Sequence, residues 1–222
     1  MRLSDQKAMT LAEAVQPKHT CIAIHDMQND FCTEGGTIYR RAAKHPEIIA
    51  EAVSQTAHLV RAARGVGIKI VYFKQFHLPN AADIPSSHIH HLVSSGLAVR
   101  VEDIPCIRGT WGHEIVDALR PHAEDIVIDK ASFNDVHGSI VDKVLRIQGI
   151  ETVLLTGVSS HAGILGTYFG LLDCGYHFYL VRECVAGYVP ELHEAAMKIM
   201  RPHLTDMTEI SAAWKAPGVG NS

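Results

Sequence analysis

The sequence lacks the signatures of several protein classes. Its five cysteines are scattered, odd in number and never spaced as Cys-x-x-Cys, which argues against a disulfide framework or a structural zinc site and fits a reducing compartment. No apolar run approaches the roughly 18 residues that a membrane span needs. Residues 1–18 are polar and lack the apolar core of a signal peptide. We therefore expect a cytoplasmic protein that does not contact membranes.

A high net charge is also missing. The net charge is −4 with histidine neutral, and no basic stripe appears, so nucleic acid is not an expected partner. The composition is ordinary for a soluble globular protein, with 47% apolar and 20% charged residues. A length of 222 residues fits one domain with a full hydrophobic core. We expect this domain over residues 20–210, with an N-terminal extension at 1–19 and a C-terminal tail at 211–222.

Short apolar runs alternate with segments of helical period along the chain. Runs rich in Val and Ile indicate strands buried on both faces, and they occupy residues 21–25, 68–73, 126–128, 152–156 and 177–181, with 204–207 as a last edge strand. Apolar residues at helical spacing indicate helices at residues 46–65, 113–119, 139–147, 160–172 and 191–200. This alternation predicts an α/β fold with a doubly wound, mainly parallel sheet between two helical layers.

Two polar residues at strand ends mark the candidate site, because ligands bind beyond the carboxyl ends of the strands in such sheets. Asp26 follows the first strand, and desolvation should raise its pKa, which suits a general acid or base; the alternative is a carboxylate that caps the next turn. Lys130 ends the third strand. Because an unpaired buried ammonium is costly, Lys130 should pair with Asp26, unless its ammonium reaches solvent.

Two further segments could contribute to a site. Residues 157–163 lead from a strand into an apolar helix, whose first N–H groups could bind a carboxylate or an oxyanion. The alternative is that Ser160 caps this helix and Gly163 allows close packing. Residues 79–110 show no strong period and have a His-rich middle, so we expect a long loop of the kind that forms a lid or a partner surface.

Taken together, these segments resemble the isochorismatase-like hydrolase family, within the cysteine hydrolase superfamily. The motifs are DMQNDF at residues 26–31, the strand-end lysine, and TGV at 156–158 before an apolar helix; RGTWG at 108–112 resembles a segment of its amidohydrolase members. The resemblance runs from about Cys21 to Ile210. It implies a six-stranded parallel sheet with flanking helices, a catalytic Asp, Lys and Cys, and a cis peptide after the Gly-Val pair, which would be Val158–Ser159.

By this resemblance the catalytic Asp and Lys are Asp26 and Lys130, and the Cys position is Gly163. Glycine carries no nucleophile, so thiol attack from this position is impossible. Isochorismatases proper resemble the chain here: they share HDMQ, found at residues 25–28, and Ala-His-x-Gly, aligned with residues 160–163, and they cleave a vinyl ether without a thiol. The resemblance thus implies a small anionic substrate of the isochorismate type, with Asp26 as general acid and Lys130 tuning it and binding a carboxylate.

Other outcomes stay open at this point. The chain could be an amidohydrolase that uses Ser159, Ser160 or an activated water, or a ligand-binding protein without activity. Residues 77–91 contain a His cluster, but the Asp-x-His of the family's nicotinamidase branch is replaced by Gln75-Phe76-His77, so we expect no metal and no cofactor. The family is usually oligomeric, so a homodimer or homotetramer is expected. The candidate substrate-binding residues are Phe31, Gln75, Arg108, Trp111, Ser159, Ser160 and His161.

Overall fold

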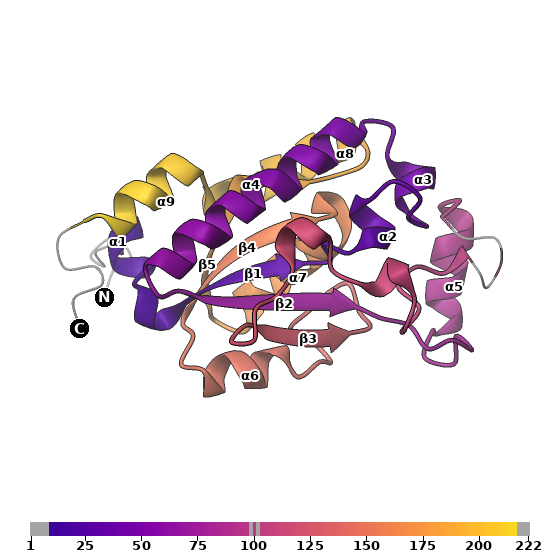
Figure 1. Ribbon diagram of the computed structural model, residues 1–222, viewed down its shortest axis with the longest axis horizontal. Helices are drawn as coiled ribbons and strands as arrows, with labels where there is room; N and C mark the ends of the chain where they lie inside the picture. Colours follow the sequence, from indigo (N-terminus) through magenta and orange to yellow (C-terminus); the bar gives the residue numbers. More distant parts are fainter. Residues whose placement is uncertain (1–8, 98–99, 101–102, 217–222) are drawn as a thin grey trace, which may run out of the picture.

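The computed structural model of the chain describes residues 9–97, 100 and 103–216. Within these residues, six parallel strands form one sheet in the order β3-β2-β1-β4-β5-β6 (Figure 1). The strands are β1 (Thr20–His25), β2 (Lys69–Gln75), β3 (Ile126–Lys130), β4 (Thr152–Val158), β5 (His177–Ala186) and β6 (Leu204–Thr205). The predicted α/β fold with a doubly wound sheet is confirmed, and every strand pair in it is parallel.

The two central strands are buried along their whole length. All six residues of β1 and all seven of β4 are buried, which explains why both appear in the sequence as continuous apolar runs. Alternate side chains of β1 enter two different cores: Ile22 and Ile24 belong to one, while Cys21 and Ala23 belong to the other. This period of two places neighbouring residues of a strand on opposite faces of the sheet.

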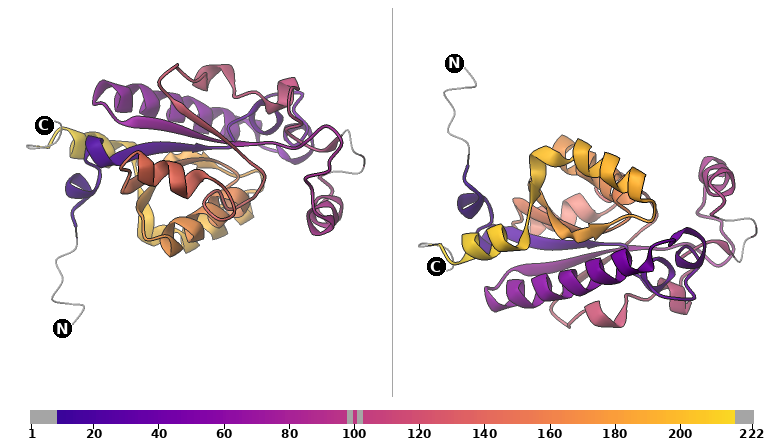
Figure 2. Two further views of the ribbon diagram at one scale, coloured as in Figure 1. Left: turned by 90° about the horizontal axis from the view of Figure 1, so that it is seen from below. Right: turned by 90° about the horizontal axis from the view of Figure 1, so that it is seen from above.

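Helices cover both faces of the sheet (Figures 1 and 2). The first core lies under α4 (Pro46–Gly65), with α1 (Leu11–Ala14) and α9 (Met207–Trp214) beside it. The second core lies under α6 (Val141–Ile147), α7 (Leu165–Asp173) and α8 (Pro190–Ile199). None of the helices among the described residues is both long and apolar enough to cross a membrane.

Three short helices lie beyond the carboxyl ends of the strands (Figure 1): α2 (Asn29–Cys32), α3 (Tyr39–Ala42) and α5 (Ser86–Ser94). The expectation of a structureless loop at residues 79–110 is therefore wrong, because α5 carries the His-rich stretch. Its Leu92 is buried, while most of its other residues are exposed or partly exposed. A helix with a single buried side chain needs no apolar stripe, so the segment shows no strong period in the sequence.

The helix expected at residues 113–119 does not form. The segment instead contains two short 3-10 turns, η4 (Trp111–His113) and η5 (Asp117–Leu119). Between them the backbone is extended, because Ile115 bridges Gln28 and the Val116 N–H donates to the Met27 carbonyl at 3.1 Å. Pairing with a distant segment outweighs the local helical spacing here.

The helix expected at 160–172 begins irregularly. A π-turn, η6 (Ser160–Ile164), comes first, and α7 continues from it. The peptide between Val158 and Ser159 is cis, as the family resemblance implied. Gly157 before it has a φ of +127°, and a Cβ on it would stand 2.1 Å from the His25 carbonyl oxygen, so only glycine fits this close approach.

Candidate active site

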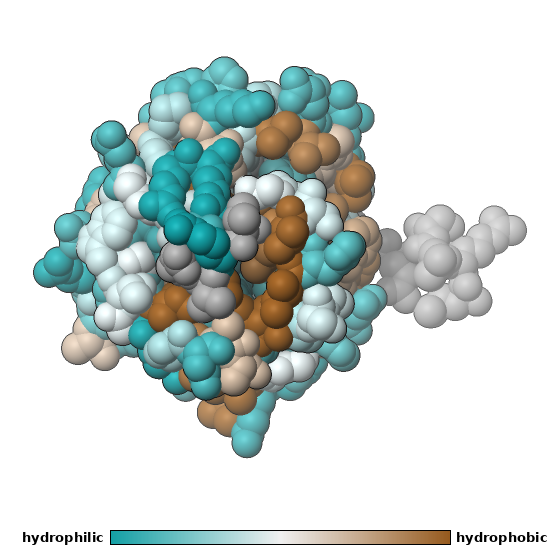
Figure 3. Space-filling view, turned by 90° about the vertical axis from the view of Figure 1, so that its right-hand side faces the viewer, coloured by the Kyte–Doolittle hydropathy of each residue, from teal (hydrophilic) through white to brown (hydrophobic). Residues whose placement is uncertain are grey.

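A cavity of about 400 Å³ opens at the carboxyl ends of the strands. It lies where the chain order reverses between β1 and β4, which is the usual ligand position in a doubly wound sheet. Asp26, from the end of β1, and Gly163, from the segment after β4, both line it. Figure 3 looks onto this end of the molecule and shows apolar side chains near the middle of the face.

Asp26 stands in a backbone conformation that few residues adopt. Its φ is +53°, in the left-handed region, which Asp and Asn tolerate better than most other side chains. Its N–H donates to the Phe73 carbonyl at 3.0 Å, which continues the β1–β2 ladder by one bond. With this backbone geometry Asp26 lines the end of the cavity, and 8% of the residue remains exposed there.

The Lys130 ammonium meets Asp26 in the interior. Its Nζ lies 2.8 Å from Asp26 Oδ1 and 3.3 Å from Asp135 Oδ1, and it donates to Gln75 Oε1 at 3.0 Å. The contact between Asp26 and Lys130 expected from the sequence is thus confirmed. Lys130 does not line the cavity, however, and its ammonium already donates hydrogen bonds to Asp26 and to the Ser132 carbonyl. It is therefore placed to position Asp26 rather than to bind a substrate carboxylate.

His25 and Asp135 complete the cluster, and sequence reasoning assigned neither a role. His25 Nδ1 lies 2.5 Å from Asp135 Oδ2, and His25 Nε2 lies 3.0 Å from Asp26 Oδ2. Both side chains have no exposed surface. His25 is the last residue of the apolar strand β1, so its place in the sequence is typical of a core residue. Asp135 follows β3 in a segment that matches no motif. Only the HDMQ motif could have drawn attention to His25.

The cluster sets the protonation of Asp26. Burial raises the pKa of the Asp26 carboxyl, but the nearby His25 and Lys130 cations outweigh burial and bring the pKa below its ordinary value of 3.8. The raised pKa expected from desolvation alone is therefore wrong. At neutral pH Asp26 is a carboxylate, and a carboxylate accepts protons rather than donating them.

The carboxylates of the cluster also shift the pKa values of His25 and Lys130. Burial lowers the pKa of His25, but Asp135 and Asp26 outweigh it, so the pKa of His25 lies above 6.5. The same two carboxylates outweigh burial at Lys130 and raise its pKa above its ordinary value. When His25 is protonated, the charges of His25 and Lys130 offset those of the two aspartates, which lowers the cost of burying the four groups together.

These shifts predict a dependence of stability on pH. The lowered pKa of Asp26 stabilises the fold above about pH 3.8, and this contribution is lost as the pH falls through the folded-state value. The raised pKa of His25 stabilises the fold below about pH 6.5, and this contribution is lost as the pH rises through the folded-state value. We expect the free energy of unfolding to decline at alkaline pH. Urea unfolding from about pH 5 to about pH 9 should show a shallower decline in His25→Gln; an unchanged slope would contradict the assignment.

No thiol borders the cavity. All five cysteines lie within the described residues, and none is among those that line it. Gly163 lines it at the position that the family resemblance assigns to the thiol. Burial raises the pKa of both Cys21 and Cys184 to about 12, so these thiols stay protonated.

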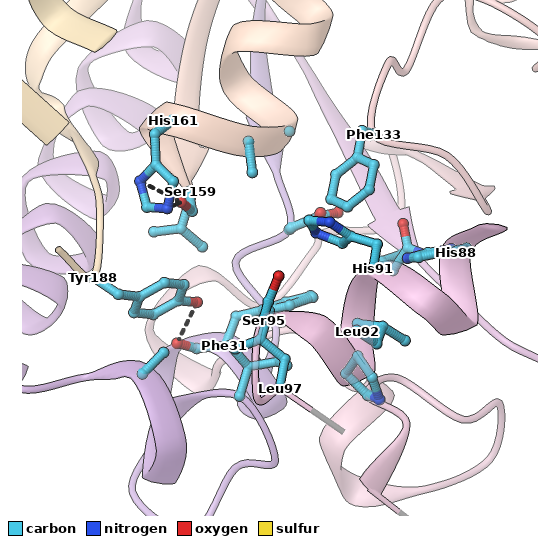
Figure 4. A pocket seen from close by; sticks show the side chains of 18 of the residues that line it. Phe31, His88, His91, Leu92, Ser95, Leu97, Phe133, Ser159, His161 and Tyr188 are labelled. Carbon is cyan, nitrogen blue, oxygen red and sulfur yellow. Dashed lines mark hydrogen bonds between the residues drawn. The ribbon is translucent and has the colours of Figure 1, made fainter. Parts of the chain in front are cut away.

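Four of the predicted substrate-binding residues line the cavity: Phe31, Gln75, Ser159 and His161. Ser160 does not line it, because its side chain is buried and its Oγ lies 3.0 Å from His193 Nδ1. The position of Ser160 therefore does not support its predicted role in substrate binding. Its neighbour Ser159 does line the cavity, and Ser159 Oγ lies 3.2 Å from His161 Nδ1 (Figure 4).

Arg108 and Trp111 do not reach the cavity either. The Arg108 guanidinium donates to Asp129 at 2.9 Å and lies over the Phe76 ring, while Trp111 is 54% exposed. Their segment packs against the DMQNDF motif instead: Asn29 Nδ2 donates to the Trp111 carbonyl at 2.9 Å. A Cβ on Gly112 would stand 2.2 Å from the carboxylate of Asp30, so the RGTWG segment is a packing motif in this chain.

The walls of the cavity are apolar and aromatic. Figure 4 shows His88 and His91 of α5 beside Phe133, with ring centroids 5.3 Å and 5.5 Å from that of Phe133. On the other side the Tyr188 hydroxyl donates to the Phe31 carbonyl at 3.0 Å. Among the described residues that line the cavity, none is Lys or Arg. Burial lowers the pKa of His161 and of His88, which leaves both neutral at pH 7.

The nearby histidines do not fit a metal ion. His77 Nδ1 lies 2.9 Å from Asp83 and His77 Nε2 lies 3.0 Å from Gln75 Nε2, so both ring nitrogens have protein partners. Over residues 9–97, 100 and 103–216, no group of three or more His, Cys, Asp or Glu side chains is arranged to hold a metal.

Comparison with known proteins agrees with this geometry. The model of the isochorismatase domain family matches residues 20–212, nearly the whole described chain. The chain belongs to the isochorismatase family. A curated relative, the ureidoacrylate amidohydrolase RutB of Methylorubrum extorquens, is 30% identical over 164 residues, which cover 71% of this chain and 64% of the relative. The chain thus matches less than two thirds of that relative's length.

Two solved structures of the isochorismatase fold are similar over most of the chain. An isochorismatase family protein from Desulfovibrio vulgaris has a TM-score of 0.74 at 25% identity, covering 90% of this chain and 100% of that one. The pyrazinamidase of Pyrococcus horikoshii, solved in complex with zinc, has a TM-score of 0.68 at 25% identity, covering 85% and 99%.

Proposed function

We propose that this chain is a hydrolase that cleaves the C–N bond of a small, uncharged amide, with a water molecule activated by Asp26 in place of a thiol. The observation that carries the proposal is the Asp26 carboxylate, which two buried cations keep ionised at the end of the cavity beside Gly163. A carboxylate that stays ionised at the cavity can accept a proton from water, with a base strength that the lowered pKa reduces. Relatives named as an amidohydrolase and a pyrazinamidase support the same class of bond.

The reaction follows from this arrangement. The Asp26 carboxylate accepts a proton from water, and the water oxygen bonds to the carbonyl carbon of the substrate while the C=O π pair moves onto the carbonyl oxygen, to return when the C–N bond breaks. The proton then passes from Asp26 to the amide nitrogen, the C–N bond breaks, and a carboxylic acid and ammonia or an amine leave. Lys130 and His25 act through Asp26: they orient its carboxylate and keep it ionised between turnovers.

Hydrolysis of a vinyl ether has less support. That reaction needs Asp26 as a protonated general acid, and the shift in its pKa has the opposite direction. An anionic substrate such as isochorismate would be favoured by a cationic wall, but no Lys or Arg is present among the described lining residues, and burial lowers the pKa of His88 and of His161. The apolar walls instead favour an uncharged substrate.

A substrate panel tests the proposal. The purified chain is incubated with neutral carboxamides and ureas of a size that fits about 400 Å³, and with isochorismate. We expect release of ammonia or amine, detected by mass spectrometry and a coupled assay, from at least one neutral amide. Release of pyruvate from isochorismate with no amide cleaved would overturn the proposal, and so would tight binding of amides without any turnover.

A second candidate uses Ser159 as the nucleophile. The observation that favours it is the 3.2 Å contact between Ser159 Oγ and His161 Nδ1 inside the cavity (Figure 4). A serine beside a neutral imidazole is the usual pair for such attack. His161 would take the Ser159 hydroxyl proton as Oγ bonds to the carbonyl carbon, and would pass that proton to the departing nitrogen as the C–N bond breaks. Water would then hydrolyse the ester on Ser159 and release the carboxylic acid.

Replacing Ser159 by Ala separates the two candidates. If water attacks directly, the variant loses only one hydrogen bond at the cavity wall, and kcat should fall by no more than about tenfold. A serine nucleophile predicts a loss of roughly a thousandfold or more. The measurement is steady-state kinetics on the best amide of the panel, with intact-protein mass spectrometry to look for an acyl-enzyme; trapping one would favour the serine.

Other expectations stay predictions. They are the cytoplasmic location, a homodimer or homotetramer, and the domain boundaries at residues 20 and 210. Cell fractionation, light scattering and limited proteolysis would measure them. The helix α9 extends across the last boundary, from Met207 to Trp214, and both Ala213 and Trp214 are buried, so we expect cleavage to occur beyond it.

A further inference from the structure

Gly163 and His25 compete for the same space. A Cβ built on Gly163 would stand 2.1 Å from His25 Nε2 and 2.7 Å from His25 Cε1. Real side chains do not approach so closely, so any residue other than glycine at 163 requires the imidazole to move. The two positions are 138 residues apart in number, and the sheet brings them together because β1 and β4 are neighbours.

The imidazole cannot move easily. Its Nδ1 is fixed by Asp135 at 2.5 Å, and the Asp135 N–H donates in turn to Thr167 Oγ1 at 3.2 Å. The backbone of His25 is equally confined, since its carbonyl oxygen lies against Gly157, where a Cβ would stand 2.1 Å away. His25 has no exposed surface, so no solvent-filled space is available for another rotamer.

We propose that His25 and Gly163 form a matched pair that determines the chemistry of the site. The imidazole fills the space that a side chain at 163 would need, and the same position brings its cationic ring next to the Asp26 carboxylate. His25 is then a positioning residue. Its Nε2 lies 3.0 Å from Asp26 Oδ2 and thereby shares with Lys130 the task of keeping that carboxylate ionised. The catalytic role of this pair rests on the proposed function, but the steric match between His25 and Gly163 can be tested without a substrate.

A double-mutant cycle on thermal stability tests the pair. Gly163→Ala in the wild-type background should lower Tm by about 5 to 10 °C, because the new methyl group overlaps the imidazole. In a His25→Ala background the same change should lower Tm by less than about 2 °C, because the space is then free. If Gly163→Ala does not fold on its own, recovery of folded protein in the double variant is the expected result.

Gly166→Ala is the matched control. Gly166 lies three residues further along the same helical segment, and its Cβ would meet the Phe133 carbonyl oxygen at 3.2 Å and the Asn134 backbone nitrogen at 3.4 Å, but no His25 atom among its three nearest neighbours. Its effect on Tm should be the same with and without His25. An equal loss from Gly163→Ala in both backgrounds, or a His25→Ala/Gly163→Ala variant that stays unfolded while His25→Ala folds, would overturn the matched pair.

The cationic role of His25 needs a separate readout that packing alone would not change. In His25→Gln, which keeps a polar side chain but no charge, the Asp26 carboxyl should titrate at higher pH than in the wild type. Carbon-13 NMR of labelled aspartate measures this directly and needs no substrate. An unshifted titration would overturn the cationic role. If the cycle and the titration behave as expected while no amide is cleaved, the proposed function fails and the matched pair stands.

Discussion

Replacing Asp26 by Asn is expected to reduce kcat on an amide substrate by about a thousandfold, within the roughly 10²- to 10⁴-fold range of a lost general base. Asn has the same shape as Asp and tolerates the left-handed backbone at φ +53°. The substitution leaves the buried cluster with an excess positive charge, which His25 can remove by losing its proton, so the fold should persist with reduced stability. The amide side chain cannot accept a proton from water, and this loss falls on the chemical step. KM should change little, because the walls of the cavity are untouched.

Asp129→Asn provides the control for this variant. Asp129 lies at the end of β3 and pairs with Arg108 outside the cavity, so its loss should leave kcat within about twofold. Stopped or continuous assays on the best substrate of the panel give kcat and KM for each variant. Retention of more than a tenth of the wild-type kcat in Asp26→Asn would exclude Asp26 as the base and would favour Ser159 as the nucleophile.

Replacing Lys130 by Met is expected to have the largest effect on stability. The buried cluster would then hold Asp26, Asp135 and a single cation, His25, and would carry one uncompensated negative charge. Removing one member of a buried set of charges costs about 3 to 5 kcal/mol, which is a large part of the roughly 5 to 15 kcal/mol that stabilises a domain. For a domain of this size Tm should fall by about 6 to 20 °C.

Lys198→Met is the matched surface variant. The Lys198 side chain is 77% exposed and pairs with Glu194 one turn earlier in α8, so its replacement should change the free energy of unfolding by less than about 0.5 kcal/mol. Urea unfolding at neutral pH compares the two. A loss for Lys130→Met as small as that for Lys198→Met would mean that the cluster is not charged as described, and the basis for an ionised Asp26 would disappear.

Much of the fold was predictable because its signals are local. The apolar runs that became β1 and β4 are buried on both faces, and such strands differ clearly in composition from the amphipathic helices between them. Helix α4 begins at Pro46 and ends at Gly65 as expected, since proline and glycine favour these two ends for reasons of backbone geometry alone. The segment at residues 113–119 was mispredicted because its partner, Gln28, is remote in sequence.

The family, the parallel sheet, and the place of Asp26 and Lys130 at strand ends could be predicted before any coordinates were known, because these depend on residue type and spacing along the chain. The tertiary structure decided the chemistry. Lys130 reaches Asp26 across 104 residues, and Asp135 reaches His25 across 110. A pKa depends on which charges and how much solvent surround a group in space. Desolvation alone therefore predicts the wrong direction for Asp26, and the assembled cluster keeps Asp26 ionised beside Gly163.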